Sequence, residues 1–250
     1  MRIVSLVPSL TEMLFDFDLQ DQLIGRTRFC KRPANKVKGI PVIGGTKNPN
    51  IDKIKLLQPD FVLANKEENR KEDIEELQSI AQVYVTDIKT VDDAMASIHQ
   101  LGKVLEREKQ AEKILTDIKA EIENISSAKP VSAAYFIWRN PWMSIGGDTY
   151  ISDVMRRWGL VNVFASEQRY PQVNLEELKG AAPEYILLSS EPFPFKQKHV
   201  QEMREIFPGS NVVLVDGQVF SWYGSRMAEA FHSLNQWRKN VRGRTIHLIP

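Results

Sequence analysis

Three segments of this chain combine aromatic side chains with charged groups at places where a ligand could bind. They are residues 138–142 (WRNPW), 191–195 (EPFPF) and 220–226 (FSWYGSR), and they lie directly after, or just beyond, apolar runs typical of strands. Flat aromatic faces suit a large planar ligand, and guanidinium groups can bind carboxylates, amides or phosphate oxygens. Exposed aromatic patches mark interaction sites. The candidate ligand contacts in these segments are Trp138, Arg139, Trp142, Glu191, Phe193, Trp222, Tyr223 and Arg226.

Several of these side chains also have a purely structural interpretation. Trp138 and Trp222 could plug the edge of a sheet from inside, since large aromatics are often substantially buried. Arg226 could pair with Glu229 or cap the last helix, and Glu191 could simply end its strand.

An internal repeat indicates which elements position these segments. Residues 50–67 (NIDKIKLLQPDFVLANKE) align without a gap on residues 174–191 (NLEELKGAAPEYILLSSE). In both copies an Asn precedes a short helical pattern, a proline stops the helix, and a strand-like apolar run follows, which suits an Asn N-cap and an X-Pro boundary. The repeat predicts two α/β lobes of one Rossmann-like design, each with a parallel sheet covered by helices.

The first strand and helix of the chain carry a second local signal. Residues 3–7 are strand-like, and Ser9 and Glu12 then have the spacing of a capping box. A helix is therefore expected to begin at this point.

The middle of the chain has a different pattern. From residue 92 to residue 125, apolar residues recur three or four apart with charges between them, which predicts one long amphipathic helix of about 50 Å. The alternative is two helices with a break at Gly102 or near residues 106–109. The expected organisation is an N-terminal lobe over residues 1–90, a linking helix over residues 91–126 and a C-terminal lobe over residues 130–250. A single rigid helix favours a preformed ligand cleft between the lobes.

Composition excludes several classes of function. The 250 residues include 33 basic and 32 acidic side chains without a concentrated basic tract, so nucleic acid is not indicated. No Ser-His-Asp order, glycine-rich phosphate loop or paired carboxylates point to an enzyme. The four histidines have no metal-site spacing, so a bound metal is expected only inside an organic chelate, with His199 as the best candidate for an axial ligand.

The order of motifs resembles a known family. Residues 5–14 (SLVPSLTEML), residues 25–30 (GRTRFC) with Pro33, the Gly44-Gly45 turn and the long central helix together resemble the helical-backbone, or class III, periplasmic substrate-binding proteins. These are receptors of ABC importers for cobalamin and ferric siderophores, and the cobalamin-binding branch is the most similar.

This resemblance implies a binding protein without covalent cofactor or enzymatic activity, monomeric, and holding a cobalamin-like corrinoid or other metal chelate between its lobes. It implies that Pro8, Arg28, Phe29 and Cys30 of the first lobe face the second-lobe loops, although Cys30 could instead be a small buried residue. A ferric siderophore or haem is the alternative ligand.

The resemblance also implies an ABC permease as partner and a periplasmic or cell-surface location. The docking glutamate of the first lobe would be Glu68 or Glu72, whereas the matching place in the second lobe has no acidic residue. Met1 is followed almost at once by a strand-like run without a leader. A cytosolic chelate-binding or sensor protein is therefore a second possibility.

Overall fold

The computed structural model describes residues 1–125 and 127–240. Ser126, the expected end of the linking helix, and residues 241–250 with His247 lie outside the described residues. The chain divides into two compact units. The first comprises Met1–Ile88, Asp92–Thr116 and Tyr223–Arg226, and the second comprises Lys89–Val91, Asp117–Trp222 and, of the residues that follow, 227–240.

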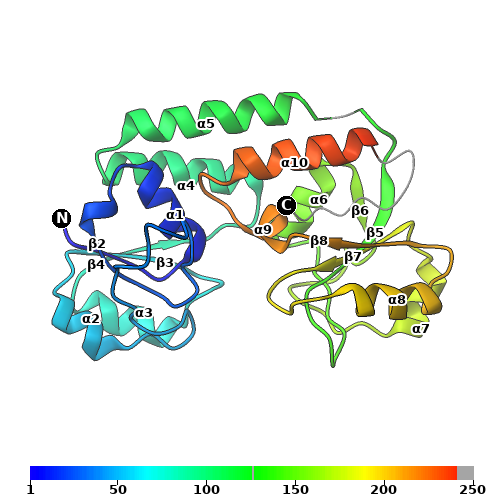
Figure 1. Ribbon diagram of the computed structural model, residues 1–250, viewed down its shortest axis with the longest axis horizontal. Coiled ribbons are helices and arrows are strands. Elements are labelled where there is room, and N and C mark those ends of the chain that lie inside the picture. Colours follow the sequence, from blue (N-terminus) through cyan, green and yellow to red (C-terminus); the bar gives the residue numbers. More distant parts are fainter. Residues whose placement is uncertain (126, 241–250) are drawn as a thin grey trace. The chain divides into compact units, whose positions relative to one another are not determined.

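The first unit contains a four-stranded parallel sheet in the order β2-β1-β3-β4. Its strands are β1 (Ile3–Ser5), β2 (Leu23–Arg26), β3 (Phe61–Asn65) and β4 (Gln82–Thr86). Helices of its first segment are α1 (Pro8–Asp16), the 3-10 helix η1 (Gln20–Gln22), α2 (Ile51–Leu57) and α3 (Lys71–Gln78). Helices α2 and α3 lie together on one face of the sheet (Figure 1), where Ile54 and Leu77 pack with Val4 and Val62 of the two central strands.

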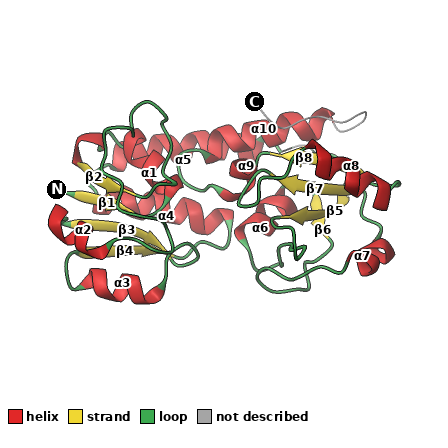
Figure 2. Ribbon diagram, turned by 60° about the horizontal axis from the view of Figure 1, so that its bottom comes forward, coloured by secondary structure: helices red, strands yellow, loops and turns green. Residues whose placement is uncertain are grey.

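The second unit repeats this plan, with a parallel sheet in the order β6-β5-β7-β8. Its strands are β5 (Val131–Phe136), β6 (Leu160–Asn162), β7 (Tyr185–Ser189) and β8 (Asn211–Val215). Its helices are α6 (Tyr150–Arg157), α7 (Leu175–Ala181), α8 (Gln197–Ile206), α9 (Gly217–Ser221) and α10 (Met227–Asn240). Figure 2 shows the yellow strands of each sheet side by side and the red helices flanking them. Leu178 of α7 and Met203 of α8 pack on Ile186 and Val212 of the sheet.

The two copies of the sequence repeat adopt the same local structure. The side chains of Asn50 and Asn174 each accept a hydrogen bond from a backbone amide in the first turn of α2 and α7. Both helices end on a left-handed residue, Gln58 or Ala182, directly before the proline. Each copy then enters the third strand of its sheet, β3 or β7. The predicted duplication of an α/β unit is confirmed.

The predicted single central helix is wrong, and the two-helix alternative is confirmed. Residues 91–123 form α4 (Val91–Val104) and α5 (Glu108–Glu123). Between them Glu106 has a left-handed φ of 54°, and the Arg107 amide donates to the Gly102 carbonyl at 2.6 Å. A Cβ on Gly102 would lie only 2.5 Å from that of Ala111, so glycine permits the close approach of the two helices at this turn. The sequence-based argument that a single rigid helix favours a preformed ligand cleft therefore no longer holds.

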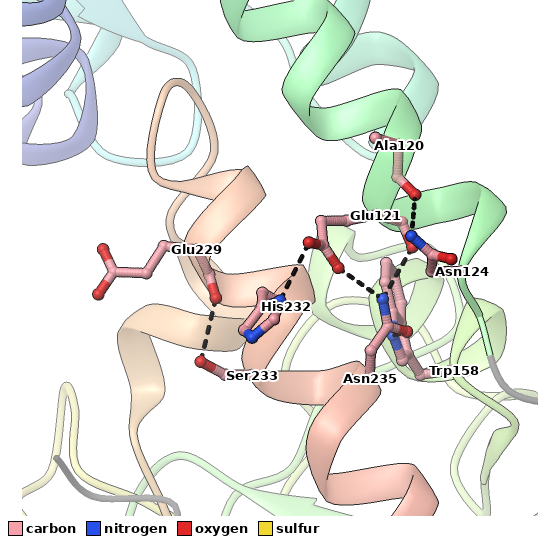
Figure 3. Close-up of polar contacts among 8 residues, drawn as sticks. All are labelled: Ala120, Glu121, Asn124, Trp158, Glu229, His232, Ser233 and Asn235. Carbon is pink, nitrogen blue, oxygen red and sulfur yellow. Dashed lines mark hydrogen bonds and ion pairs between the residues drawn. The ribbon is translucent and has the colours of Figure 1, made fainter.

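The last turns of α5 belong to the second unit and are held there by a polar network (Figure 3). The amide group of Asn235 on α10 donates to the main-chain oxygen of Glu121 at 2.8 Å and to its carboxylate at 2.9 Å. The same side chain accepts from the Trp158 indole N–H at 2.9 Å, and His232 lies 3.0 Å from the Glu121 carboxylate. The network joins α10 to the C-terminal turns of α5 and to the residue after α6.

Asp153 of α6 binds the first residue of α4, which lies 62 residues earlier in the chain. Its buried carboxylate accepts from the Val91 amide at 2.9 Å and from Arg156 and Arg157. Burial by itself would raise the pKa of Asp153, but the hydrogen bonds from the Val91 amide and the two arginines outweigh it and lower this pKa. The ionised carboxylate therefore stabilises the folded state.

Replacing Asp153 with asparagine is expected to reduce the free energy of unfolding by about 2 kcal/mol at pH 7. Because the folded-state pKa is the lower one, this contribution is complete above the unfolded-state pKa of about 4 and is lost as the pH falls through the folded-state value. Urea unfolding at pH 7 and in stepwise more acidic buffers measures it, with Asp117→Asn, an exposed site on α5, as control. A wild-type advantage that stays constant down to pH 3 would contradict the prediction.

Within residues 1–125 and 127–240, no helix combines the length and the apolar character required to cross a membrane.

Candidate ligand-binding site

The first two aromatic segments lie side by side because they follow neighbouring parallel strands. Strand β5 pairs with β7, so the loops after both strands leave the same edge of the sheet, where open α/β sheets bind ligands. The loop after β5 turns back at once, with the Met143 amide donating to the Trp138 carbonyl at 3.1 Å. The Phe193 amide from the loop after β7 donates to the Ile137 carbonyl at 3.2 Å. Backbone bonds thus bring Trp138 and Phe193 together.

The rings of these loops form one continuous group, here called the aromatic patch. Its members are Trp138, Trp142, Phe193 and Phe195. Trp138 meets Phe193 edge to face at 5.7 Å between centroids, Phe193 meets Phe195 at 4.8 Å, and Phe195 stacks on Trp142 at 5.8 Å with 8° between ring planes.

Exposure within the aromatic patch is graded. Phe195 is buried and anchors the group in the core, and Trp142 and Phe193 are half-buried. Trp138 is 41% exposed, which is high for a tryptophan, although its indole packs against Phe193. The interpretation of Trp138 as an interior aromatic is wrong. The patch is a preassembled apolar surface with one tryptophan free to stack on a ligand.

Arg139 adds a cation to the edge of the patch. Its guanidinium lies 5.5 Å from the Trp142 ring centroid and forms a 2.6 Å ion pair with Glu202 of α8. Both side chains are partly exposed, at 28% and 35%. The positive charge of the Arg139 guanidinium is therefore already paired with the Glu202 carboxylate.

His199 of α8 supports the patch from behind and is a poor metal ligand. The imidazole is buried, lies 5.5 Å from the rings of Phe193 and Phe195, and accepts the Lys196 amide on Nδ1 at 2.9 Å. Burial, together with the positive charges of Lys198 and Arg139, lowers the pKa of His199 and favours the neutral ring. That ring then carries its proton on Nε2, so neither nitrogen offers a lone pair to a metal.

Trp222 and Glu191 form a hydrogen bond with each other, and the Trp222 side chain is buried. Trp222 is 9% exposed, and its indole N–H donates to the Glu191 carboxylate at 2.9 Å. Ser221 donates to the same oxygen at 3.0 Å, and a Cβ on Gly217 would lie 2.5 Å from the Glu191 side chain. Burial raises the pKa of Glu191, and the nearby Asp216 adds to this effect. The interior interpretation of Trp222 is confirmed, and this pair supports the loops structurally.

Tyr223 and Arg226 belong to the first unit, which corrects their assignment to the second lobe. The Tyr223 hydroxyl donates to the Glu68 carboxylate at 3.2 Å, and the tyrosine is buried. Arg226 donates from two nitrogens to the two carboxylate oxygens of Glu12, and each of these side chains is 12% exposed. The capping box predicted for Ser9 and Glu12 is wrong, because α1 begins after Val7 without a side-chain cap and Glu12 bonds Arg226 instead.

The first unit offers a separate aromatic and cationic pair. The Arg28 guanidinium lies 5.0 Å from the Phe29 ring centroid, and Phe29 is 45% exposed. Both side chains lie over the Gly44-Gly45 turn, where a Cβ on Gly45 would meet each at 3.4 Å. Pro8, also predicted as a contact, is the half-buried first residue of α1.

Cys30 is enclosed in the first unit. It has no exposed surface, and its sulfur lies 3.0 Å from the Thr11 hydroxyl and 3.1 Å from the Thr27 hydroxyl. Burial raises the pKa of the Cys30 thiol, which disfavours the thiolate that metal binding requires. Its alternative interpretation, a small buried residue, fits this environment. In the part of the chain that the structure describes, no group of three His, Cys, Asp or Glu side chains could hold a metal ion.

The chain thus has two sheets of one design, with an aromatic surface at the carboxyl edge of the second. The chain belongs to the Periplasmic binding protein family, whose model matches residues 3–206. It is a substrate-binding protein and not an enzyme.

Known relatives include the "Vitamin B12-binding protein" of Pectobacterium carotovorum subsp. carotovorum, which is 29% identical over 235 residues, covering 90% of this chain and 84% of the relative. Two solved structures share the fold. The periplasmic vitamin B12 binding protein BtuF of Vibrio cholerae has a TM-score of 0.82 at 22% identity, covering 97% of this chain and 98% of the other. The periplasmic haem-binding protein HutB of Vibrio cholerae has a TM-score of 0.81 at 17% identity, covering 97% and 99%.

Sequence reasoning missed two residues that support the aromatic patch, and it missed the partner of Arg226. Glu202 and His199 lie on α8, outside the aromatic segments, and Glu12 lies on α1. Glu202 lies 63 residues from its partner Arg139, and Glu12 lies 214 residues from Arg226. His199 lies 6 residues from Phe193. A signal was present for α8, since it directly follows residues 191–195 and was therefore bound to pack near them.

Proposed function

We propose that this protein is the receptor for a cobalamin-like corrinoid and that the aromatic patch of the second unit is a principal contact surface for it. The carrying observation is Trp138, an exposed indole held in place by Phe193 at the carboxyl edge of a parallel sheet. A corrin ring offers a broad, partly apolar face for such an indole, while the amides around the ring suit hydrogen bonds from Arg139 and the loop backbone. The curated vitamin B12-binding relatives support this ligand class.

A second candidate ligand is haem or a ferric siderophore. The observation that favours it is Arg28, an exposed guanidinium beside the exposed ring of Phe29 in the first unit. Propionate or hydroxamate oxygens would pair with such a cation. A haem-binding protein shares the fold, which is compatible with this ligand but does not favour it over a corrinoid.

The test is a titration of the purified protein with cyanocobalamin, cobinamide, haem and a set of ferric siderophores, followed by tryptophan fluorescence and by calorimetry. We expect saturable one-to-one binding of a corrinoid with a Kd in the micromolar range or below. Binding of haem or a siderophore without any corrinoid binding would replace the first proposal by the second. A flat calorimetric response to every ligand at about 100 μM would contradict both.

The same proposal includes delivery of the ligand to an ABC importer permease outside the cytoplasm. Glu72 is exposed in the first turn of α3 and is the better docking candidate, since the carboxylate of Glu68 accepts the Tyr223 hydroxyl. Ligand-dependent stimulation of a reconstituted importer's ATPase, reduced in Glu72→Ala, is the observation that would support it.

A further inference from the structure

Glu202 lies next to the aromatic patch but outside the segments that form it. Its carboxylate is 2.6 Å from a terminal nitrogen of Arg139, which lies over Trp142 at 5.5 Å. Glu202 comes from α8, whereas Arg139 comes from the loop after β5, so the ion pair ties a helix to the loop that carries Trp138. The pair also places a negative charge beside the Arg139 guanidinium at the edge of the patch.

Several charged groups near this end of α8 are cations. The positive charges of Lys198, Arg139 and Lys196 act on His199, and the negative charge of Glu202 opposes them. Lys196 and Lys198 are exposed, whereas Arg139 is partly covered and directed along the Trp142 ring. Without Glu202, this edge would carry an excess of positive charge that attracts carboxylates.

We propose that Glu202 is a positioning residue that sets the ligand selectivity of the patch: by neutralising Arg139 and holding it against Trp142, it favours a chelate with an amide periphery over one with a carboxylate periphery. This inference rests on the proposed corrinoid-binding function. A guanidinium shared with a carboxylate still donates hydrogen bonds to amide oxygens through its remaining N–H groups, but it no longer attracts anions strongly. Electrostatic complementarity of this kind acts mainly on specificity.

The experiment uses two corrinoids that differ at the ring periphery, cobyric acid, which carries amides, and cobyrinic acid, which has carboxylates in place of those amides. The selectivity ratio is the Kd of cobyrinic acid divided by the Kd of cobyric acid, measured by calorimetry at low ionic strength. We expect Glu202→Gln to lower this ratio by about fivefold, because partly exposed charge pairs contribute up to about 1 kcal/mol. Glu205→Gln, the same charge change at an exposed site of α8, should leave the ratio within about twofold.

Two further variants separate a charge effect from mere loosening of the loop. Arg139→Gln leaves the Glu202 carboxylate alone and should raise the ratio, whereas the double variant should return it close to the wild-type value. A simple packing defect would weaken both corrinoids equally in all three variants and would leave the ratio unchanged, which would overturn the inference. Failure of the wild-type protein to bind either corrinoid would instead contradict the proposed function.

Discussion

Replacing Trp138 with alanine is expected to weaken corrinoid binding about 30-fold, a loss of ~2 kcal/mol, because an exposed aromatic anchor of this type carries a large share of binding energy. The indole is 41% exposed and already held by Phe193, so a ligand can stack on it without first ordering the side chain. Calorimetric titration of the wild type and the variant measures the change.

The controls for this prediction are chosen by exposure. Leu56→Ala removes a large apolar side chain that is 84% exposed on α2, and it should leave binding unaffected. Trp222→Phe keeps a buried ring but removes the indole donor to Glu191, so its main effect should be on thermal stability. An unchanged Kd in Trp138→Ala, in a variant that unfolds like the wild type, would remove the patch from the ligand site.

Breaking the ion pair between Glu12 and Arg226 is expected to give the largest loss of stability. Arg226→Met leaves the Glu12 carboxylate without a bidentate partner in a site where each side chain is 12% exposed. Removing one partner of a buried pair costs about 3 kcal/mol or more, because the remaining charge stays desolvated. Asp16, whose pKa is raised by burial and by the charge of Glu12, would lose the opposing influence of Arg226. Urea unfolding monitored by circular dichroism measures the effect.

A double variant and an exposed ion pair serve as controls for this prediction. Glu12→Gln combined with Arg226→Met removes both charges and should recover part of the loss, because no unpaired charge remains. Lys179→Gln breaks an exposed pair with Glu176 and should change stability by less than about 1 kcal/mol. Equal, small effects of Arg226→Met and Lys179→Gln would show that solvent reaches the Glu12 carboxylate.

Local sequence signals predicted the repeated α/β unit well. The Asn N-caps of α2 and α7, the stops before Pro59 and Pro183 and the strands that follow are decided by residues within a few positions of each other. The prediction that residues 138–142 and 191–195 directly follow strands was also correct, and the parallel pairing of β5 with β7 brings both segments to one sheet edge.

The central helix shows where the same reasoning fails. Both α4 and α5 have an apolar face, so the amphipathic periodicity continues from one helix into the other. Periodicity alone therefore does not reveal that the chain turns between them. The break depends on Glu106 in a left-handed conformation and on close packing of Gly102 against Ala111. The assignment of all of residues 220–226 to the second lobe was wrong for a similar reason. Hydrogen bonds to Glu191, Glu12 and Glu68 decide how this segment is divided between the units.

By itself the sequence determined the duplicated α/β architecture, the kind of side chains available for a ligand and the absence of an enzyme motif, because these depend on residue type and short-range spacing. Only the tertiary structure decided which of those side chains are accessible. Trp138 and Phe29 are exposed, whereas Trp222, Tyr223 and Cys30 are buried, although residue type alone made all five plausible contacts. Burial and charge pairing arise from contacts between residues far apart in the chain, and no local pattern encodes them.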